Sequence, residues 1–511
     1  MAGWRFFQEE RVVSLSEVTV GLVAFAIVLL IVKGRRKNIN NVSFPPGPKS
    51  WPIIGNMFQL GEYPHLTLTK MSEKYGDVFC IKLGMIPVVV VSGAETIKRA
   101  LIKKGEVFAG RPDLYTFSVI AKGPSLTFTE KYGEGWKLHK KIAKSALRTF
   151  SQTEAQNSTY LCLLEERVCT EVTELIKVLL NLAEKEVGFD PVGPITSAVA
   201  NVICGLCFGK RYDHNDEEFL SMVQANHKIM RTFASGNIAD FLPFFRYLPS
   251  PSLKFADKLN KFMINSIEEH YTSFDQNCVR DITDVFIALC ENKNLEQKTA
   301  QLTNEQIIAT VIDIFGAGFD TISTALQWCF LYLVRYPEIQ TRMQEEIDKK
   351  LGQHRSPRFE DRTLLPYVEA FINEVFRITT FVPLVIPHST TTSTVLNGYY
   401  IPKDTCVFIN QYQVNHDKTL WKDAESFIPE RFLDDSGQLK KDLIDKVMIF
   451  GMGKRRCLGD SLARVEIFIF LTTVLHQLKI ENLPDQKLDL TPNYGLTMKP
   501  TCYKIIVSPR K

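Results

Sequence analysis

The chain has 511 residues, of which 45% are hydrophobic and 23% charged, and its formal net charge at neutral pH is +4. This composition is typical of a folded globular protein and excludes a disordered or fibrous chain. So slight a net charge gives no reason to expect nucleic acid among its partners. The length permits one large domain or several average ones.

Residues 18–32 are almost entirely apolar, and a basic cluster follows directly at 33–37. Extended back to Val12, the segment reaches roughly 30 Å as a helix, enough to cross one bilayer. A cleaved signal peptide is the alternative, but no small-residue cleavage pattern is present. We therefore predict a single N-terminal transmembrane anchor helix within residues 1–44, and the positive-inside rule places the following chain in the cytosol.

The run Pro45-Pro-Gly-Pro48 cannot continue the anchor helix, because successive prolines fix an extended chain. It predicts a domain boundary near residue 45. Beyond it, helical periodicity dominates and strand-like runs are few. Predicted helices include 304–336, 371–377 and 461–478, and predicted strands are 78–83, 87–91, 405–410 and 503–507. The predicted fold class is mostly α with a minor β part (α+β).

Eleven cysteines are scattered without regular spacing, which favours reduced thiols over a disulfide framework. Cys204 and Cys207 form the one close pair. Neither a second such pair nor a nearby histidine is present to complete a zinc site. We predict that both are buried core thiols.

The long helix predicted at 304–336 carries Phe315-Gly-Ala-Gly-Phe-Asp-Thr321 in its middle. Each glycine costs a helix about 1 kcal/mol relative to alanine. Gly316 and Gly318 either admit a bulky group against the backbone or allow close helix packing, and the sequence alone favours packing. Thr321 can hydrogen-bond a carbonyl of the preceding turn and open the helix locally.

The run Phe450-Gly-Met-Gly-Lys-Arg-Arg-Cys-Leu-Gly459 is a glycine-rich loop that presents Cys457 just before a helix. Neighbouring cations and the helix N-terminus favour a thiolate there. A thiolate is the ligand that a haem iron needs for O–O cleavage. By itself, however, a single loop cysteine is more often inert.

The arrangement of Phe450, Gly453, Arg455, Cys457 and Gly459 resembles the haem-binding signature of the cytochromes P450. Further family motifs are matched, in the same chain order, by 136–140, 317–321, 374–377 and 429–432. The resemblance extends from the predicted anchor to the last strand. It implies a cytochrome P450 fold in which residues 45–511 form a haem-thiolate monooxygenase domain that binds haem b, iron protoporphyrin IX.

The resemblance also implies residue roles. Cys457 would be the axial ligand of the haem iron, and Thr321 and Asp320 would be catalytic, as a proton relay in oxygen activation. The other haem contacts would be Trp136, Lys140, Ala317, His388, Phe450, Gly453 and Arg455. The residues Glu374, Arg377 and Arg431 would form a buried network that braces the Cys457 loop, since such charges are costly to bury unpaired.

Lys140 departs from the family, which usually carries arginine at this position. Lysine keeps the charge but lacks the bidentate fork for a haem propionate, a task that Lys141 could share. Lys140, Lys141, Lys454 and Arg456 would lie on the face that receives electrons from an acidic reductase. Ordinary solubilising charge is the alternative explanation of these residues.

The resemblance implies electron supply from NADPH through NADPH–cytochrome P450 reductase, which carries FAD and FMN, with cytochrome b5 as a second candidate partner. It also implies attachment to the endoplasmic reticulum membrane. Two other functions stay open: a haem-thiolate isomerase of peroxides, and a non-catalytic haem sensor or carrier. Thr321 argues against the isomerase, because that reaction needs no proton delivery to bound oxygen.

Segments 108–117, 315–321, 386–391 and 494–499 are most similar to vertebrate family 1, the aryl hydrocarbon hydroxylases. This implies flat lipophilic substrates such as polycyclic aromatic xenobiotics, oestrogens and polyunsaturated fatty acids. The implied substrate-binding residues are Thr127, Phe128, Asp313, Ala317, Phe319, Val382, Ile386, Leu496 and Thr497. Phe128 and Phe319 could stack on a planar ring or could simply be core residues. Ile229 stands where family 1 usually places a stacking phenylalanine, which predicts a looser roof.

Overall fold

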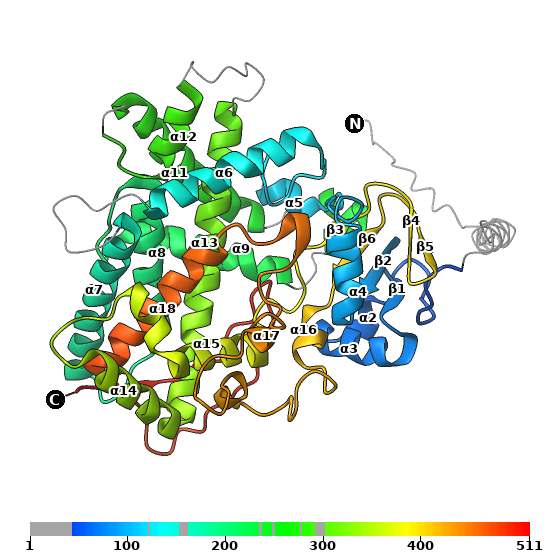
Figure 1. Cartoon of the computed structure of the whole chain (residues 1–511). Helices are drawn as coiled ribbons and strands as arrows, with labels where there is room; N and C mark the ends of the chain where they lie inside the picture. Colours follow the sequence, from blue (N-terminus) through cyan, green and yellow to red (C-terminus); the bar gives the residue numbers. More distant parts are fainter. Residues whose placement is uncertain are drawn as a thin grey trace, which may run out of the picture.

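The computed structural model describes residues 43–120, 123–152, 162–234, 238–247, 251–275, 278–291 and 302–510. The predicted anchor helix therefore lies outside the described residues. Figure 1 shows a helical part on one side of the molecule and a smaller part that contains the main sheet on the other. The predicted fold class, mostly α with a minor β part, is confirmed.

The elements of the helical part are α5 (Tyr115–Ile120), α6 (Glu134–Gln152), α7 (Leu163–Lys185), α8 (Val192–Phe208), α9 (Glu217–Ala234), α10 (Ile238–Phe241), α11 (Pro251–Ser273), α12 (Ile282–Glu291), α13 (Asn304–Arg335), α14 (Pro337–Leu351), α15 (Pro366–Thr379) and α18 (Asp460–Gln477). The hairpin of β7 (Leu478–Asn482) and β8 (Ile505–Pro509) joins them. The sheet part contains α2 (Met57–Leu60), α3 (Pro64–Tyr75), β1 (Val78–Leu83), β2 (Ile86–Val91), α4 (Ala94–Lys98), β3 (His388–Ser389), β4 (Thr394–Leu396), β5 (Tyr399–Ile401), β6 (Cys406–Ile409), α16 (Gln411–Asn415) and α17 (Lys441–Ile444).

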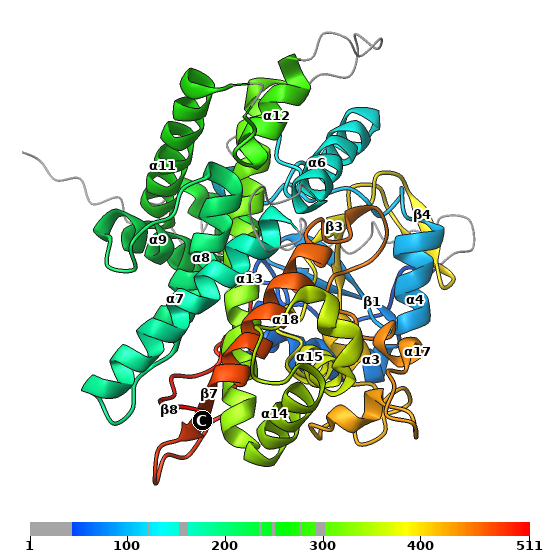
Figure 2. The same ribbon diagram turned by 60° about the vertical axis from the view of Figure 1, so that its left-hand side comes forward.

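Helix α13 runs through the middle of the helical part, with α18 beside it (Figure 2). It starts with a capping box, in which Thr303 Oγ1 accepts from the Gln306 amide and Gln306 Oε1 accepts from the Thr303 amide. Among the described helices it alone is long and apolar enough to cross a membrane, but its most apolar stretch is mainly buried in the protein. It is therefore the central core helix.

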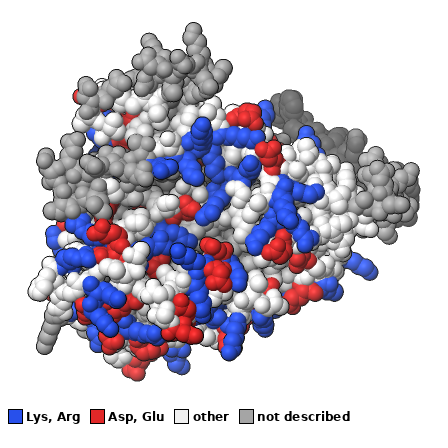
Figure 3. All heavy atoms as spheres, viewed as in Figure 1, with Lys and Arg blue, Asp and Glu red and all other residues white. Residues whose placement is uncertain are grey.

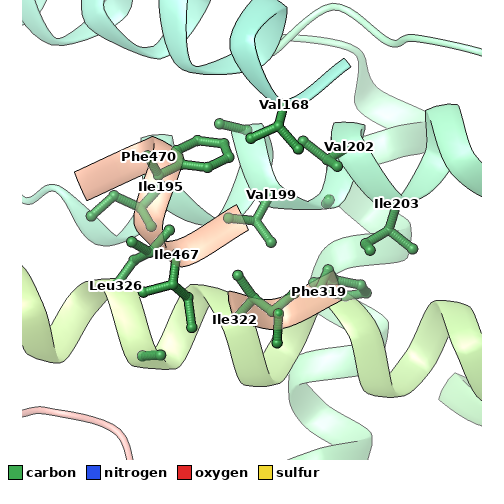
Figure 4. Close-up of a cluster of buried hydrophobic side chains, with 14 of the residues drawn as sticks. Val168, Ile195, Val199, Val202, Ile203, Phe319, Ile322, Leu326, Ile467 and Phe470 are labelled. Carbon is green, nitrogen blue, oxygen red and sulfur yellow. The ribbon is translucent and has the colours of Figure 1, made fainter. Parts of the chain in front are cut away.

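The core around α13 explains one of its glycines. Val199 and Ile203 of α8 face Phe319, Ile322 and neighbouring residues of α13 (Figure 4). A Cβ at Gly318 would lie 3.0 Å from the Ile203 side chain, so glycine permits this close approach. The packing explanation thus holds for Gly318. Cys204 and Cys207, on the same helix α8, are fully buried free thiols, as predicted.

The main sheet has the strand order β1-β2-β6-β3. Strands β1 and β2 are antiparallel, β2 and β6 are parallel, and β3 pairs antiparallel with β6. The sequence predicted β1 with the observed bounds, and β2 and β6 to within about two residues. Strand β3 lies at one edge of this sheet, where His388 pairs with Val407.

Candidate active site

The loop that presents Cys457 is held against the sheet part. Gly453 has φ +67°, and a Cβ there would lie 1.9 Å from the Leu101 carbonyl oxygen, so only glycine fits. The Cys457 amide donates to the Phe450 carbonyl at 2.9 Å, which closes the loop. Helix α18 begins at Asp460, three residues later. The thiol therefore lies at a helix N-terminus, as the sequence predicted.

Cys457 lines a largely apolar cavity of about 280 Å³, here called the cysteine cavity. Its walls come from α6, α13, α18 and the segment that follows α15. Of the residues predicted for haem, catalysis or substrate, those that line it are Thr127, Trp136, Lys140, Asp313, Ala317, Thr321, Val382, Ile386, Phe450, Arg455 and Cys457. Residues from across the whole chain thus meet around one space.

Other predicted site residues lie elsewhere. Phe319 is fully buried between α13 and α8, because it follows Ala317 by two residues and so points about 200° around the helix from it. Phe128 and Leu496 line a neighbouring cavity instead. Ile229 is buried in the core and lines neither cavity. The structure therefore supports the core interpretation of Phe319.

The predicted catalytic pair is divided between two environments. Thr321 faces the cysteine cavity, and its hydroxyl donates to the Ala317 carbonyl at 2.8 Å, one turn back as predicted. Asp320 is buried and turned away: its carboxylate accepts from Thr497 Oγ1 and from Lys499 Nζ, both at 2.7 Å. This bond also explains why Thr497 does not line the cavity. Only Thr321 is in place to act directly on a ligand.

Glu374, Arg377 and Arg431 meet in a buried network. Arg377 Nε lies 2.7 Å from Glu374 Oε2, and Arg431 Nε lies 3.0 Å from Glu374 Oε1. Arg377 also donates to the Asn415 carbonyl, and the Asn415 side chain exchanges two hydrogen bonds with the Met448 backbone. A continuous chain of hydrogen bonds thus leads from α15 to the segment that enters the Cys457 loop.

A cluster of cationic groups borders the cysteine cavity. Arg455 lies over the Trp136 ring at 4.2 Å and donates to the carbonyls of Ala109 and Leu126. Arg111 is buried beside it and donates to the carbonyls of Thr127 and Ile386; burial and the Arg455 charge lower the pKa of Arg111 well below its usual range. Positive charge is therefore concentrated here.

The cluster has little negative charge to balance it. Asp313 is the one carboxylate that acts on both guanidinium groups in the described structure, and burial raises the pKa of Asp313 to about 6. His388 Nδ1 lies 2.7 Å from the Phe108 carbonyl, while its buried Nε2 has no hydrogen-bond partner among the described residues. The site therefore calls for an anionic group that also accepts hydrogen bonds.

Comparison with family models matches residues 45–507 to the family described as "Cytochrome P450". The chain belongs to the cytochrome P450 family. It is 49% identical over 494 residues to "Cytochrome P450 1A5" of Gallus gallus, covering 95% of this chain and 94% of that protein. It is likewise 49% identical over 494 residues to "Cytochrome P450 1A1" of Sparus aurata and of Oncorhynchus mykiss, covering 95% of each chain. The protein is therefore a P450 monooxygenase, and haem is its cofactor.

The residues of this P450 suit haem. An apolar cavity with a thiol on one wall and buried cations at its border matches a flat apolar ring that carries two carboxylates. Cys457 would hold the iron, and Arg111, Trp136, His388 and Arg455 would hold the propionates. Sequence reasoning missed Arg111. Its signal was an arginine between Gly110 and Pro112, one residue after the apolar pair Phe108-Ala109.

Lys140 binds the backbone of the loop that carries Cys457. Its Nζ donates to the carbonyls of Lys454 at 2.7 Å and Arg456 at 2.9 Å, and lies 5.4 Å over the Trp136 ring. Burial and the Arg455 charge lower the pKa of Lys140 to about 8. The ammonium group thus ties α6 to the two residues that flank Arg455, and so to the P450 loop that carries Cys457.

The surroundings of the Cys457 thiol act on its pKa in both directions. Burial raises the pKa of the thiol, and the Gly459 amide, Lys140 and Arg456 oppose this only in part. Arg455 turns to the carbonyls of Ala109 and Leu126. In the haem-loaded P450, coordination would favour the thiolate as well, since a thiol bound to a metal ion loses its proton.

Proposed function

We propose that this P450 inserts one oxygen atom of O₂ into flat lipophilic molecules, with electrons from NADPH supplied through a reductase that carries FAD and FMN. The observation that carries the proposal is that Cys457, Ala317 and Thr321 line one apolar cavity. When bound, haem supplies a redox-active iron, and a thiolate ligand favours O–O cleavage. The small side chain of Ala317 leaves room beside α13, and the Thr321 hydroxyl supplies an exchangeable proton.

The walls support flat apolar substrates. Val382, Ile386 and Ala317 offer hydrocarbon surface, while Thr127 and Asp313 add polar groups at one side. The Asp313 carboxylate accepts from Ser125 Oγ at 2.9 Å and from the Thr127 amide at 3.1 Å, which fixes this wall. The proposed substrates are polycyclic aromatic xenobiotics, oestrogens and polyunsaturated fatty acids.

Turnover in membranes that contain NADPH and the reductase tests this function. We expect products of flat aromatics, oestrogens or fatty acids that carry one atom of ¹⁸O when ¹⁸O₂ is supplied. Stoichiometric ligand binding without any product would contradict an enzyme and favour a haem sensor or carrier. The ¹⁸O label identifies monooxygenation, because isomerisation of a peroxide takes no oxygen from O₂.

The Thr321 hydroxyl gives a second test that distinguishes monooxygenation from peroxide isomerisation, because only monooxygenation needs proton delivery to bound oxygen. Thr321→Ala should form less product per NADPH consumed, by roughly ten- to a hundredfold, because general acid–base groups contribute factors of this order or more. Thr321→Ser keeps the hydroxyl and serves as the control. A Thr321→Ala enzyme that hydroxylates as fast as the wild type would argue against the proton relay.

An exposed apolar surface supports attachment to the endoplasmic reticulum membrane. Phe58 and Tyr247 expose 82% and 90% of their surface, and Trp51 and Met85 are also strongly exposed. The chain segments that carry these four residues lie side by side: the Met85 amide donates to the Phe241 carbonyl, and the Gly84 amide donates to the Ile54 carbonyl. Large exposed aromatics are typical of surfaces that enter a lipid interface. We propose that this surface rests on the membrane, with the catalytic domain, residues 45–511, in the cytosol.

A basic surface supports docking of the electron donor. Lys141 and Lys144 are exposed on α6, and Lys454 and Arg456 are exposed on the Cys457 loop. Figure 3 shows Lys and Arg gathered over α6 and the adjacent region. An acidic partner would be steered to this basic face. We propose it as the docking surface for the reductase and, as an alternative donor, cytochrome b5.

A further inference from the structure

Two buried polar groups outside the cysteine cavity face each other without a hydrogen bond. Glu171 belongs to α7, and His214 belongs to the loop 209–216, which joins α8 to α9. Glu171 Oε2 lies 3.9 Å from His214 Nε2, and the Glu171 side chain is only 5% exposed. Both atoms are buried, and neither has a hydrogen-bond partner among the described residues. A carboxylate oxygen and an imidazole nitrogen left unsatisfied together call for a ligand between them.

The loop 209–216 holds His214 in a defined place. The side chain of Asn201, on α8, donates to the Tyr212 carbonyl and accepts from the Tyr212 amide, both at 2.9 Å. The Tyr212 ring stacks on Phe219 of α9, with centroids 5.4 Å apart and planes inclined at 9°. Helix α8 packs against both α7 and α9 (Figure 2). The two groups are therefore positioned before any ligand binds.

The gap between the two atoms suits a metal ion. At 3.9 Å it is too long for a hydrogen bond, and a water about 2.8 Å from each atom would be bent nearly to a right angle. Zinc binds imidazole nitrogen and carboxylate oxygen at about 2.0–2.2 Å, so two ligand atoms of one ion lie within roughly 4.3 Å of each other. Tetrahedral geometry needs about 3.4 Å, which a small rotation of either side chain supplies.

The types of ligand atom select the metal. Calcium and magnesium take oxygen ligands, whereas an imidazole beside a carboxylate suits zinc. Arg211 already donates through Nε to Glu171 Oε1, which fixes the carboxylate and leaves Oε2 directed toward His214. Outer partners of this kind commonly orient the ligands of a metal ion.

Glu174 is placed to give a third ligand. It follows Glu171 by three residues on α7, so the two carboxylates share one face of the helix. The hydrogen bond from Lys177 lowers the pKa of Glu174 most, and the charges of Arg211 and His214 lower it further, so the carboxylate lies within reach of these groups. The Lys177 side chain is 66% exposed, so Glu174 can leave it at little cost.

We propose that Glu171, Glu174 and His214 bind one zinc ion, with a water molecule as the fourth ligand. The ion joins α7 to the loop 209–216 and so fixes the start of α9. None of the three residues lines the cysteine cavity. The inference therefore goes beyond the proposed function and does not depend on it.

The test is a calorimetric titration of the full-length, haem-loaded enzyme, without an affinity tag, with zinc chloride. We expect a site in the wild type that His214→Gln and Glu174→Gln each weaken at least tenfold, because even the loss of an outer partner costs about that much. His354→Gln removes an exposed histidine outside the site and is the matched control. Saturating zinc should raise the thermal midpoint of the wild type by about 2–4 °C and leave that of His214→Gln unchanged.

The pH dependence distinguishes the zinc site from a direct ion pair of Glu171 with His214. Zinc requires an unprotonated imidazole, so its binding should weaken as the pH falls, whereas the ion pair strengthens and needs no zinc. Equal zinc affinity in the wild type and His214→Gln, or a thermal midpoint that zinc does not change, would overturn the site. Undiminished affinity in Glu174→Gln would overturn the third ligand. These measurements need no turnover, so they do not depend on whether oxygenated product forms.

Discussion

At the scale of single residues, Lys140 is the site residue that departs from the family motif. Arginine usually occupies this position in the family, where it serves the cofactor. Here the shorter, more compact ammonium group binds two carbonyls of the Cys457 loop. We expect Arg111 and Arg455 to supply most of the charge that holds the propionates.

Lys140→Ala should therefore loosen the loop more than it weakens haem binding. Loss of two charge-assisted hydrogen bonds costs about 1–3 kcal/mol. We expect the red-shifted carbon monoxide band of the ferrous enzyme to be lost at a lower temperature, while the haem content after purification stays near that of the wild type. Lys140→Arg is the control. Loss of haem without loosening of the loop would instead assign Lys140 to a propionate.

The sequence predicted single residues well where a role depends on local spacing. Cys457, Phe450 and Gly453 lie within one loop, so their motif determined their arrangement. Asp320 was different, because its partners Thr497 and Lys499 lie far away in the chain. The family motif named both Asp320 and Thr321 without saying which of them faces the cavity and which contacts the C-terminal loop.

At the scale of elements, α15 is tied to the segment Pro429–Phe432 through Glu374. Both Glu374 and Arg377 are 0% exposed, so neither charge can be solvated when its partner is lost. Arg377→Ala should destabilise the fold by about 3–5 kcal/mol, the usual cost of breaking a buried pair. Reduced haem incorporation and a lower thermal unfolding midpoint would show this.

The matched control lies on the surface. Arg342→Ala removes an ion pair with Glu430, in which both side chains are about half exposed. Exposed pairs contribute about 0–1 kcal/mol, so this variant should retain nearly all of its haem and stability. Equal losses in the two variants would contradict the special role of the buried network.

Helices α11 and α12 are joined by a buried ion pair that depends on pH. His270 Nε2 lies 2.7 Å from Asp281 Oδ2. Burial lowers the pKa of His270, but the hydrogen bond and charge of Asp281 outweigh it and raise the pKa overall. Asp284 completes a cluster of possible metal ligands, but its oxygens already contact Arg280 at 2.7 and 2.8 Å. The Arg280 guanidinium therefore already supplies the positive charge that a metal ion would bring to this cluster.

Because the pKa of His270 is higher in the folded state, its protonation stabilises the fold fully below about pH 6.5. This contribution is lost as the pH rises through the folded-state pKa. His270→Gln should therefore lower the thermal midpoint most at about pH 6 and progressively less toward pH 8.5. Exposed His354→Gln should show no such trend. A deficit that is constant with pH would contradict a charged pair.

The elements show a similar division between what was and was not predictable. The long helix α13 and strand β1 followed from hydrophobic periodicity and were placed accurately. Phe319 was assigned to the substrate site by resemblance, although helical geometry turns it toward α8. The cavity that Phe128 and Leu496 line was predicted only in part: the resemblance named these two residues and Ile386, but not the walls near residues 60, 117 and 240.

At the scale of the whole molecule, the basic surface on α6 and the Cys457 loop should govern association with the reductase. Charge reversal at Lys141 and Lys144 should raise the reductase concentration needed for half-maximal turnover by roughly tenfold at low salt, because charge steering accelerates association by such factors. The difference should shrink as ionic strength rises. Turnover at several salt concentrations provides the measurement.

Reversal at Lys254 is the control, because this exposed lysine lies on α11 and not on α6 or the Cys457 loop. It changes the net charge by the same amount per substituted residue and should leave unaltered the reductase concentration needed for half-maximal turnover. Should both reversals weaken turnover to the same extent, the effect would reflect net charge and not a docking surface.

The contact between Gly453 and the Leu101 carbonyl has a consequence for folding. The two residues are separated by roughly 350 positions in the chain, and their contact joins the sheet part to the loop that presents Cys457. Contacts of such long range form slowly, because a large loop must close before they contribute. Haem capture by the newly made chain therefore awaits synthesis of nearly the whole protein, and a truncated or stalled chain would lack a competent ligand loop.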